Sequence, residues 1–544
     1  MSYKANETQQ VGLNDRFNHL TEKEKKVVLS SWAKPFADIV FPSIHEDDFA
    51  VLYSDNKATR PNTPINIVVG AMILQEIVGM TDAETLESLS CDIRMQYALH
   101  TTSYPEQPMS DRTFSRFRRR LYDYELETGE DLMKEEILAL SGKIAQFMEL
   151  QPYLNRMDSL MVASACKNMT RLEVIYVTVA NLVNALHRIG GDEFLQGMEH
   201  YLNPDDQNRV IYHNKAEDRV RKMQEIVEDC AKLLERMGEC CPELPEYSLA
   251  VRMLDDQSVI GSDGKRIAKN NHDIAAASMQ NPSDPEATYR KKAEKHYKGY
   301  VANVVQAYDE KGAAVITDYD FQQNSYSDVD FGKDALEVIA ENVHEGDTTE
   351  TQVTSDGAFY SEENSELAKK NGIIFITTSL TGTKPAEILA GFVINSEEHQ
   401  IEQCPMGYKP ESQSWNSSKD ANRIVMEKGQ CENCPHRAEC KAQITKYHAF
   451  VTISASRVEH AKLVKEISSE SYAKNRNARN AVEGLPSVLR RRYHVDDMPV
   501  FGLVKSKLRF GFKIAAINVK NLLKYTRGHC ACKDATFIPR EQCV

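Results

Sequence analysis

The sequence predicts an α/β protein with large all-α parts, and two observations support this. Helical periodicity runs through long stretches such as INIVVGAMILQEIVGM, RLEVIYVTVANLVNALHRI and AEDRVRKMQEIVEDCAKLLERM. Between about residues 296 and 380, by contrast, the pattern reads as a hairpin followed by helix, strand, helix and strand. Such an order is typical of a mixed core built on a central sheet.

A chain of 544 residues is too long for a single hydrophobic core. We therefore expect a helical N-terminal domain, an α/β core in two pieces, a helical insertion, a polar cysteine-bearing insertion and a helical, basic C-terminal region. Their expected bounds are 1–150, then 151–170 with 251–380, then 171–250, 381–450 and 451–544.

Composition narrows the class of protein. The chain is 41% hydrophobic and 27% charged, which is ordinary for a water-soluble globular protein. The first twenty residues lack a signal-peptide core, and no window holds the 18 or so apolar residues of a spanning helix. We therefore expect a cytoplasmic protein with no membrane partner. Twelve unevenly spaced cysteines favour metal binding or reduced thiols over disulfides.

A helix over SDRTFSRFRRRL has two distinct faces. Phe114, Phe117 and Leu121 share one side, whereas arginines recur on another side, at Arg112, Arg116, Arg119 and Arg120. The arginine face could lie against DNA. It could equally be a solvated face balanced by the acidic run ETGEDLMKEE, and the sequence does not decide between the two.

Charge is segregated along the chain. Residues 441–530 hold 18 Lys and Arg against 6 Asp and Glu, although the whole chain carries a net charge of −14. Glu483 lies within this basic segment, on a helical face shared with Arg476, Arg479 and Arg490. This is the pattern expected of a metal-bound carboxylate whose substrate is a polyanion.

Two further acids stand at the ends of predicted strands. Asp158 lies in the β-prone run NRMDSLMVAS, and Asp356 ends the strand TETQVTSD. Any one acid is most often a surface charge, but Asp158, Asp356 and Glu483 could converge on one edge of the sheet as a divalent-metal site.

Four cysteines cluster in the polar insertion. They lie in CPMGY and CENCPHRAEC, as Cys404, Cys431, Cys434 and Cys440. One C-x-x-C pair could share a tetrahedral zinc ion, but the spacing is not that of two symmetric knuckles. A structural zinc site and simple reduced thiols both remain open, with a redox role the weakest alternative.

Nucleotide-binding fingerprints are missing from the sequence. Neither G-x-x-x-x-G-K-[ST] nor G-x-G-x-x-G occurs, which disfavours an ATP-driven or nicotinamide enzyme.

Several stretches, taken in order, resemble bacterial insertion-sequence transposases of the DDE type, nearest to the eleven-eighty-two group. They are PINIVVGAMILQEIVGMTDAETLESLSCDIRMQYAL with TFSRFRRRL, RMDSLMVASACKNMTRLEVIYVTVANLV, MQNPSDPEATYRKKAEKHYKGYVANV, VTSDGAFYSEENSELAKKNGIIFITTSLTGT, and AVEGLPSVLRRRYHV with FKIAAIN. The first of these resembles an InsH-like helical domain that precedes the catalytic core.

The resemblance implies a ribonuclease-H-like core in which Asp158, Asp356 and Glu483 form the acid triad and hold two Mg²⁺ ions. It also implies double-stranded DNA as substrate and a homodimer on paired DNA ends. Related elements often carry Tyr, Arg, Glu and Lys around the glutamate. Here Arg476 replaces the tyrosine and Arg490 replaces the lysine, whereas Arg479 and Glu483 match.

We therefore interpret the chain as a transposase, associated with the nucleoid, that binds the terminal inverted repeats of its element, cleaves the ends and joins the 3′-hydroxyls to target DNA. Arg112, Arg116, Arg119, Arg476, Arg479 and Arg490 are the expected DNA contacts. Two rival interpretations remain: a catalytically silent DNA-binding regulator, and a metal-dependent nuclease that cuts without joining.

Overall fold

The structure is a computed structural model of the full chain. It describes residues 1–529 apart from 7–14, 57, 152, 213–215, 239, 293, 310, 343–349, 378–384, 396–399, 418–420 and 468–483. The chain divides into two compact units. Unit 1 comprises Met1–Pro152, Ser159–Ser327 and Leu485–Val544, and unit 2 comprises Tyr153–Asp158 and Asp328–Gly484.

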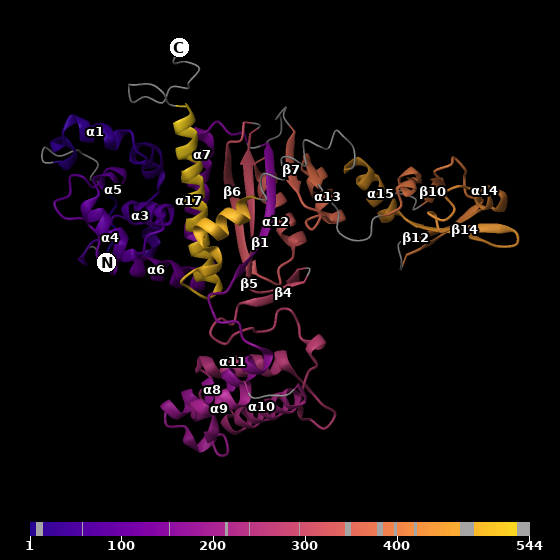
Figure 1. Ribbon diagram of the computed structural model, residues 1–544, viewed down its shortest axis with the longest axis horizontal. Helices are drawn as coiled ribbons and strands as arrows, with labels where there is room; N and C mark the ends of the chain where they lie inside the picture. The colour runs from indigo at the N-terminus through magenta and orange to yellow at the C-terminus, as the bar shows by residue number, and fades with distance from the viewer. Residues whose placement is uncertain are drawn as a thin grey trace, which may run out of the picture. The chain divides into compact units, whose positions relative to one another are not determined.

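Unit 1 begins with a helical region (Figure 1). Its helices are α1 (Glu22–Leu29), α2 (Ala33–Pro35), α3 (Ile65–Val78), α4 (Asp82–Cys91), α5 (Ile93–Ala98), α6 (Thr113–Thr128) and α7 (Leu132–Phe147). Helix α4 begins with a capping box, because Thr81 N–H donates to the Glu84 carboxylate at 2.7 Å and Thr81 Oγ1 accepts from Glu84 N–H at 3.3 Å. The predicted helical N-terminal segment is therefore present.

Helix α3 is the core helix of this region. It is apolar on all sides, and every residue from 65 to 75 is buried. Among the described residues no single helix is long and apolar enough to cross a membrane, although α3 and α4 together, bent by 106°, satisfy the same length and composition test.

The strands of unit 1 form an antiparallel group. They are β4 (Thr288–Lys292), β5 (Lys295–Tyr308) and β6 (Ala314–Gln323), with the later part of β1 (Leu154–Ala163) beside β5. Both β4 and β6 pair with β5. Strand β5 bends closely around the end of β1 at Gly299, where a Cβ atom would lie 2.3 Å from the Val162 carbonyl oxygen. The predicted hairpin over 296–321 is confirmed.

Helix α17 (Leu503–His529) packs beside α7 and β6 (Figure 1). Phe510 contacts Tyr319 and Phe321 of β6, with ring centroids 5.9 and 5.3 Å apart. The segment FKIAAIN is almost wholly buried. The C-terminal helix is therefore largely buried, although its positive charge predicts a partner for phosphates.

A helical insertion follows β1 within unit 1. Its helices are α8 (Arg171–Arg188), α9 (Pro204–Ile211), α10 (Ala216–Met237) and α11 (Pro245–Gln257). They enclose a core of their own, in which Tyr176, Val227 and Met253 are essentially inaccessible to solvent. A short hairpin of β2 (Ser258–Ile260) and β3 (Arg266–Ala268) follows.

Unit 2 contains a parallel group of strands. The start of β1 pairs with β7 (Thr351–Ser355), which in turn pairs with β8 (Ile373–Thr377). Helix α12 (Asp328–Glu341) precedes β7 in the chain, and α13 (Glu362–Lys370) connects β7 to β8. The predicted order of helix, strand, helix and strand is confirmed. Strand β8 is less buried than expected, since Ile374 is 37% exposed.

The cysteine-bearing segment is an ordered β module, which corrects our expectation of a polar insertion without regular pattern. A four-stranded antiparallel sheet has the order β11-β12-β14-β13, beside a β9-β10 hairpin. The strands are β9 (Val393–Asn395), β10 (Gln400–Gln403), β11 (Ser412–Asn416), β12 (Ala421–Glu427), β13 (Gln443–Ile444) and β14 (His448–Ser454). Helices α14 (Lys428–Glu432) and α15 (Ala455–Ile467) complete it.

Residues 484–493 form a further helix.

Candidate functional site

The paired residues of β1 and β7 lie shortly before Asp158 and Asp356 in the chain. Both strands lie parallel in unit 2, and the register pairs Asn155 with Val353 and Arg156 with Thr354. Asp158 and Asp356 each lie two residues beyond the last of these pairs. Residues level in adjacent strands have backbones roughly 5 Å apart and side chains on the same face. We infer that the two carboxylates share one face at the carboxyl end of β7.

Strand β1 holds Asp158 rigidly. Asn155, Arg156 and Met157 before it and Ser159 after it are buried, which is typical of a strand covered on both faces. Asp158 itself is half-buried.

Asp356 is oriented by the turn that follows β7. Its Oδ1 accepts a hydrogen bond from Ala358 N–H at 2.8 Å, and its carbonyl oxygen accepts from Phe359 N–H at 3.3 Å. Phe359 is only 1% exposed. Asn364 on α13 donates through Nδ2 to the Phe359 carbonyl at 2.9 Å. The turn is therefore tied down beyond the acid, as a positioned ligand requires.

Part of the predicted site lies outside the described residues, namely Glu483, Arg476 and Arg479.

In the described part of the chain, one group brings three metal-ligand atoms within 4.8 Å of one another: His45, Asp48 and Glu136 in unit 1. Hydrogen bonds account for this group, because Glu136 accepts from His45 N–H at 3.1 Å and contacts His45 Nδ1 at 3.3 Å. Burial raises the pKa of Glu136 to about 7.

Arg490 makes contacts inside unit 1. Its Nε donates to Asp496 Oδ2 at 3.1 Å, and its Nη2 donates to the Met161 carbonyl on β1 at 2.8 Å. Asp496 also accepts from Ala163 N–H at 3.1 Å. The guanidinium thus holds the end of the strand that carries Asp158, a contact that the sequence did not indicate.

Helix α6 has the two faces that the sequence predicted. Phe114, Phe117 and Leu121 are buried, and Phe117 lies 5.8 Å from Phe49, measured between ring centroids. Arg112, Arg116 and Arg119 are exposed. Arg119 approaches Asp123 at 3.5 Å, but this pair is well exposed and contributes little to stability.

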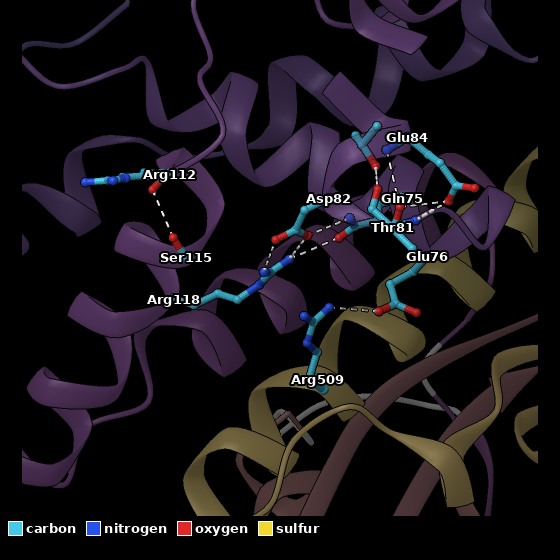
Figure 2. Close-up of polar contacts among 10 residues, drawn as sticks. Gln75, Glu76, Thr81, Asp82, Glu84, Arg112, Ser115, Arg118 and Arg509 are labelled. Carbon is cyan, nitrogen blue, oxygen red and sulfur yellow. Dashed lines mark hydrogen bonds and ion pairs between the residues drawn. The ribbon is translucent and has the colours of Figure 1, made fainter. Parts of the chain in front are cut away.

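Arg118 is the arginine of α6 that sequence reasoning missed. It turns inward, and its guanidinium donates two hydrogen bonds to Asp82 at 2.8 Å each and one to Gln75 at 3.1 Å (Figure 2). Figure 2 shows Arg112 directed away from this pair. Burial acts to raise the pKa of Asp82, but the hydrogen bonds from Arg118 and Gln75 outweigh it, so the pKa lies below its usual value.

Much of the positive charge on α17 is neutralised by acidic residues of unit 1. This corrects our expectation that the basic residues of this helix are available to bind phosphates. Lys513 Nζ lies 3.0 Å from Glu76 and Arg509 lies 3.6 Å from the same carboxylate. Lys507 pairs with Glu125 and, at 3.2 Å, with Asp131. These cations anchor α17 to the helical region.

The four cysteines of the β module line one small cavity, about 30 Å³ in volume. All four thiols are free and half-buried. Burial, followed by the charges of the other three thiols, raises the pKa of Cys440 to about 11. Such mutual influence means that the thiols lie near one another. Their sulfur atoms are nevertheless not among the ligand groups that close within 4.8 Å in the described residues.

Two segments of the chain match known protein families. Residues 403–523 match a family model described as a transposase DDE domain. Residues 26–120 match a model described as a transposase domain (DUF772). The first segment includes the four cysteines, Glu483 and Arg490, and the second includes Arg112, Arg116 and Arg119. No curated protein and no solved structure matches the chain.

Proposed function

We propose that the chain is a DDE-type transposase, as the matches of residues 403–523 and 26–120 to transposase family models indicate, and that it binds the terminal inverted repeats of an insertion sequence, cleaves the element ends and joins their 3′-hydroxyls to target DNA. The observation that supports this proposal is the β1–β7 register, in which Arg156 pairs with Thr354, two residues before Asp158 and Asp356 respectively.

The residues fit hard divalent cations. Half-buried carboxylates on neighbouring strands offer the oxygen ligands that Mg²⁺ prefers. Asp158, Asp356 and Glu483 would hold two Mg²⁺ ions, which when bound supply activation of the attacking water or 3′-hydroxyl and stabilisation of the leaving oxygen. The chain's own part is to fix the direction of these carboxylates, through buried β1 and through the Ala358 N–H bond to Asp356.

A ribonuclease-H-like core is proposed for the sheet. Strand β1 is central: antiparallel β5 and β6 belong to one side of it, and parallel β7 and β8 to the other. The first acid is on the central strand and the second follows the adjacent parallel strand. This arrangement supports the fold that the resemblance implies.

The exposed arginines of α6 are proposed as DNA contacts. Arg112, Arg116 and Arg119 point to solvent from a helix whose other face is fixed in a core. Arginine on an exposed helix face can neutralise phosphates or donate to base edges. Arg476 and Arg479 are proposed to contact the cleaved strand near Glu483.

Arg490 requires a modified proposal. Its contacts with Asp496 and the Met161 carbonyl support a structural role at the end of β1 in place of the DNA contact expected from the sequence. A homodimer on paired DNA ends follows from the need to cut both ends of one element.

One assay separates this function from its rivals. Purified protein is incubated with Mg²⁺, labelled end DNA and a supercoiled target plasmid. A transposase produces cleaved ends and joined products, a cut-only nuclease produces cleaved ends alone, and a silent regulator shifts the DNA in a gel without cutting it. Random-sequence DNA of the same length is the control for end recognition.

A further inference from the structure

The β module of unit 2 brings four cysteines from three separate segments to one cavity. Cys404 follows β10, Cys431 and Cys434 lie in and just after α14, and Cys440 precedes β13. All four line the same cavity, whose volume of about 30 Å³ is enough for one ion but not for an organic ligand. No step of the proposed DNA chemistry uses these residues.

Each cysteine sits in a tight backbone turn. At Cys404 the N–H donates to the Tyr408 carbonyl and the carbonyl accepts from Gly407 N–H, both at 2.9 Å. Gly407 makes this turn feasible with a φ of +87°. Cys434 N–H lies 3.4 Å from the Cys431 carbonyl, so the C-x-x-C pair also closes a turn. Cys440 N–H donates to the His436 carbonyl at 3.0 Å, so the fourth cysteine also lies in a turn.

The module has few other means of holding this end in place. Its hydrophobic core consists of about ten buried residues, among them Ile424, Met426 and Val451. Residues 404–411 contain no helix or strand, and 428–442 contain only the five-residue helix α14. Small domains with limited cores are commonly stapled by a disulfide or a structural metal. All four cysteines are free thiols, which leaves the metal.

We propose that Cys404, Cys431, Cys434 and Cys440 bind one structural Zn²⁺ ion in a tetrahedral all-sulfur site. Binding forms four Zn–S bonds and releases the four thiol protons to solvent. With four protein ligands no position is left for water, so the ion cross-links the module and does not activate a reactant. The sulfurs must close to roughly 3.8 Å from one another, the separation set by Zn–S bonds of about 2.3 Å.

His436 and Arg437 line the same cavity. His436 Nδ1 lies 3.0 Å from the Glu439 carboxylate, so this ring nitrogen already has a partner. Apart from the four cysteines, His436 is the remaining side chain in the cavity that is a candidate to replace one thiolate. The Arg437 guanidinium offers positive charge beside a centre that would carry a net charge of −2.

The test uses the purified full chain and measures metal content by inductively coupled plasma mass spectrometry. We expect about one zinc per chain. Replacement of zinc by Co²⁺ should give sulfur-to-cobalt charge-transfer absorption and the visible bands of a tetrahedral ion. The double variant Cys431→Ser/Cys434→Ser should lose almost all bound zinc, whereas Cys91→Ser, which removes an exposed thiol far from the module in sequence, should retain it. His436→Ala should also retain zinc.

A second measurement covers the case in which the double variant does not fold. In the wild-type chain, a chelator should make four additional thiols reactive toward an alkylating reagent, and mass spectrometry should map them to the four named positions. Wild-type protein with zinc far below one equivalent after expression in zinc-supplemented medium, and no cobalt spectrum, would overturn the proposal. None of these readouts involves DNA, so their outcome is independent of whether the protein is an active transposase.

Discussion

Arg156 on β1 is paired in parallel register with Thr354 on β7, and Asp158 and Asp356 each follow two residues after these partners. The two acids are 198 positions apart in the sequence. The proposed metal site requires the register to continue over these two residues, which would put both carboxylates on one face of the sheet. A helical insertion with its own core, α8 to α11, lies between them in the chain.

Gly332 on α12 is predicted to control the position of Asp356. A Cβ atom there would lie 2.8 Å from Asn364 Nδ2 and 3.1 Å from the Phe359 carbonyl oxygen, which are the groups that hold the turn after Asp356. Gly332→Ala should therefore lower end cleavage by roughly 100-fold, as misplacement of about 1 Å does, with DNA binding retained. The measurement is single-turnover cleavage beside a gel-shift titration.

Gly142→Ala is the matched control, because this glycine also lies in a helix and a Cβ atom added to it would have no neighbour within 4 Å. It should leave cleavage unchanged and add about 0.5–1 kcal/mol to local stability. Cleavage at the wild-type rate in Gly332→Ala would remove the role assigned to the turn.

Arg118 is predicted to stabilise the helical region. Arg118→Ala removes three hydrogen bonds made by a buried guanidinium and leaves Asp82 with Gln75 as its partner, so it should cost about 2–3 kcal/mol. Because the chain has several domains, hydrogen exchange of α3, α4 and α6 is the suitable measurement. Arg116→Ala removes an exposed arginine from the same helix and should change protection by less than about 0.5 kcal/mol. Equal effects of the two substitutions would contradict this account.

The arginine face of α6 is predicted to contact phosphates. Replacing Arg112, Arg116 and Arg119 with Ala should reduce the slope of log K against log salt by about 2–3, since each lost phosphate contact contributes roughly 0.9. The measurement is a binding titration at several salt concentrations, with end DNA and with random duplex. Alanine at Lys23, Lys25 and Lys26 of α1 removes the same charge elsewhere in the helical region. If both triple variants keep the wild-type slope, α6 is a solvated face.

Glu136 is predicted to make the helical region less stable as pH rises. Burial raises its pKa from about 4.5 to about 7, so between these values the folded chain keeps a proton that the unfolded chain has released. Stability should therefore fall through this window, by up to about 2–3 kcal/mol, and level off above pH 7. Glu136→Gln should flatten this part of the pH profile, measured by hydrogen exchange at α7.

Glu135→Gln is the control for this pH profile, because Glu135 is its exposed neighbour on α7. It should follow the wild-type curve. A wild-type profile that rises from pH 4.5 to 7 relative to Glu136→Gln would show that the carboxylate is charged in the folded state.

Features that depend on nearby residues could be predicted from the sequence. The capping box at Thr81, the buried Phe114 and Phe117 of α6, and the strand that ends before Asp356 all follow from local patterns. In each case the residues that decide the structure lie within one turn or one strand.

Features that depend on distant partners could not be predicted. The sequence gives no sign that Arg118 selects Asp82, 36 residues away, or that Glu76 pairs with Lys513, 437 residues away. A run of Lys and Arg looks the same whether it faces DNA or buried acids. The β module was missed because its strands carry polar residues such as Asn422 among apolar ones and are separated by turn-rich loops.

The central claim is that Asp158 and Asp356 hold catalytic metal beside the DNA strand to be cut. The most direct measurement is Mg²⁺-dependent cleavage of labelled end DNA by Asp158→Asn, Asp356→Asn and Glu483→Gln, with binding to the same DNA measured in parallel. We expect each substitution to abolish cleavage while binding stays near wild type. Cleavage at the wild-type rate by purified Asp356→Asn protein would contradict the claim.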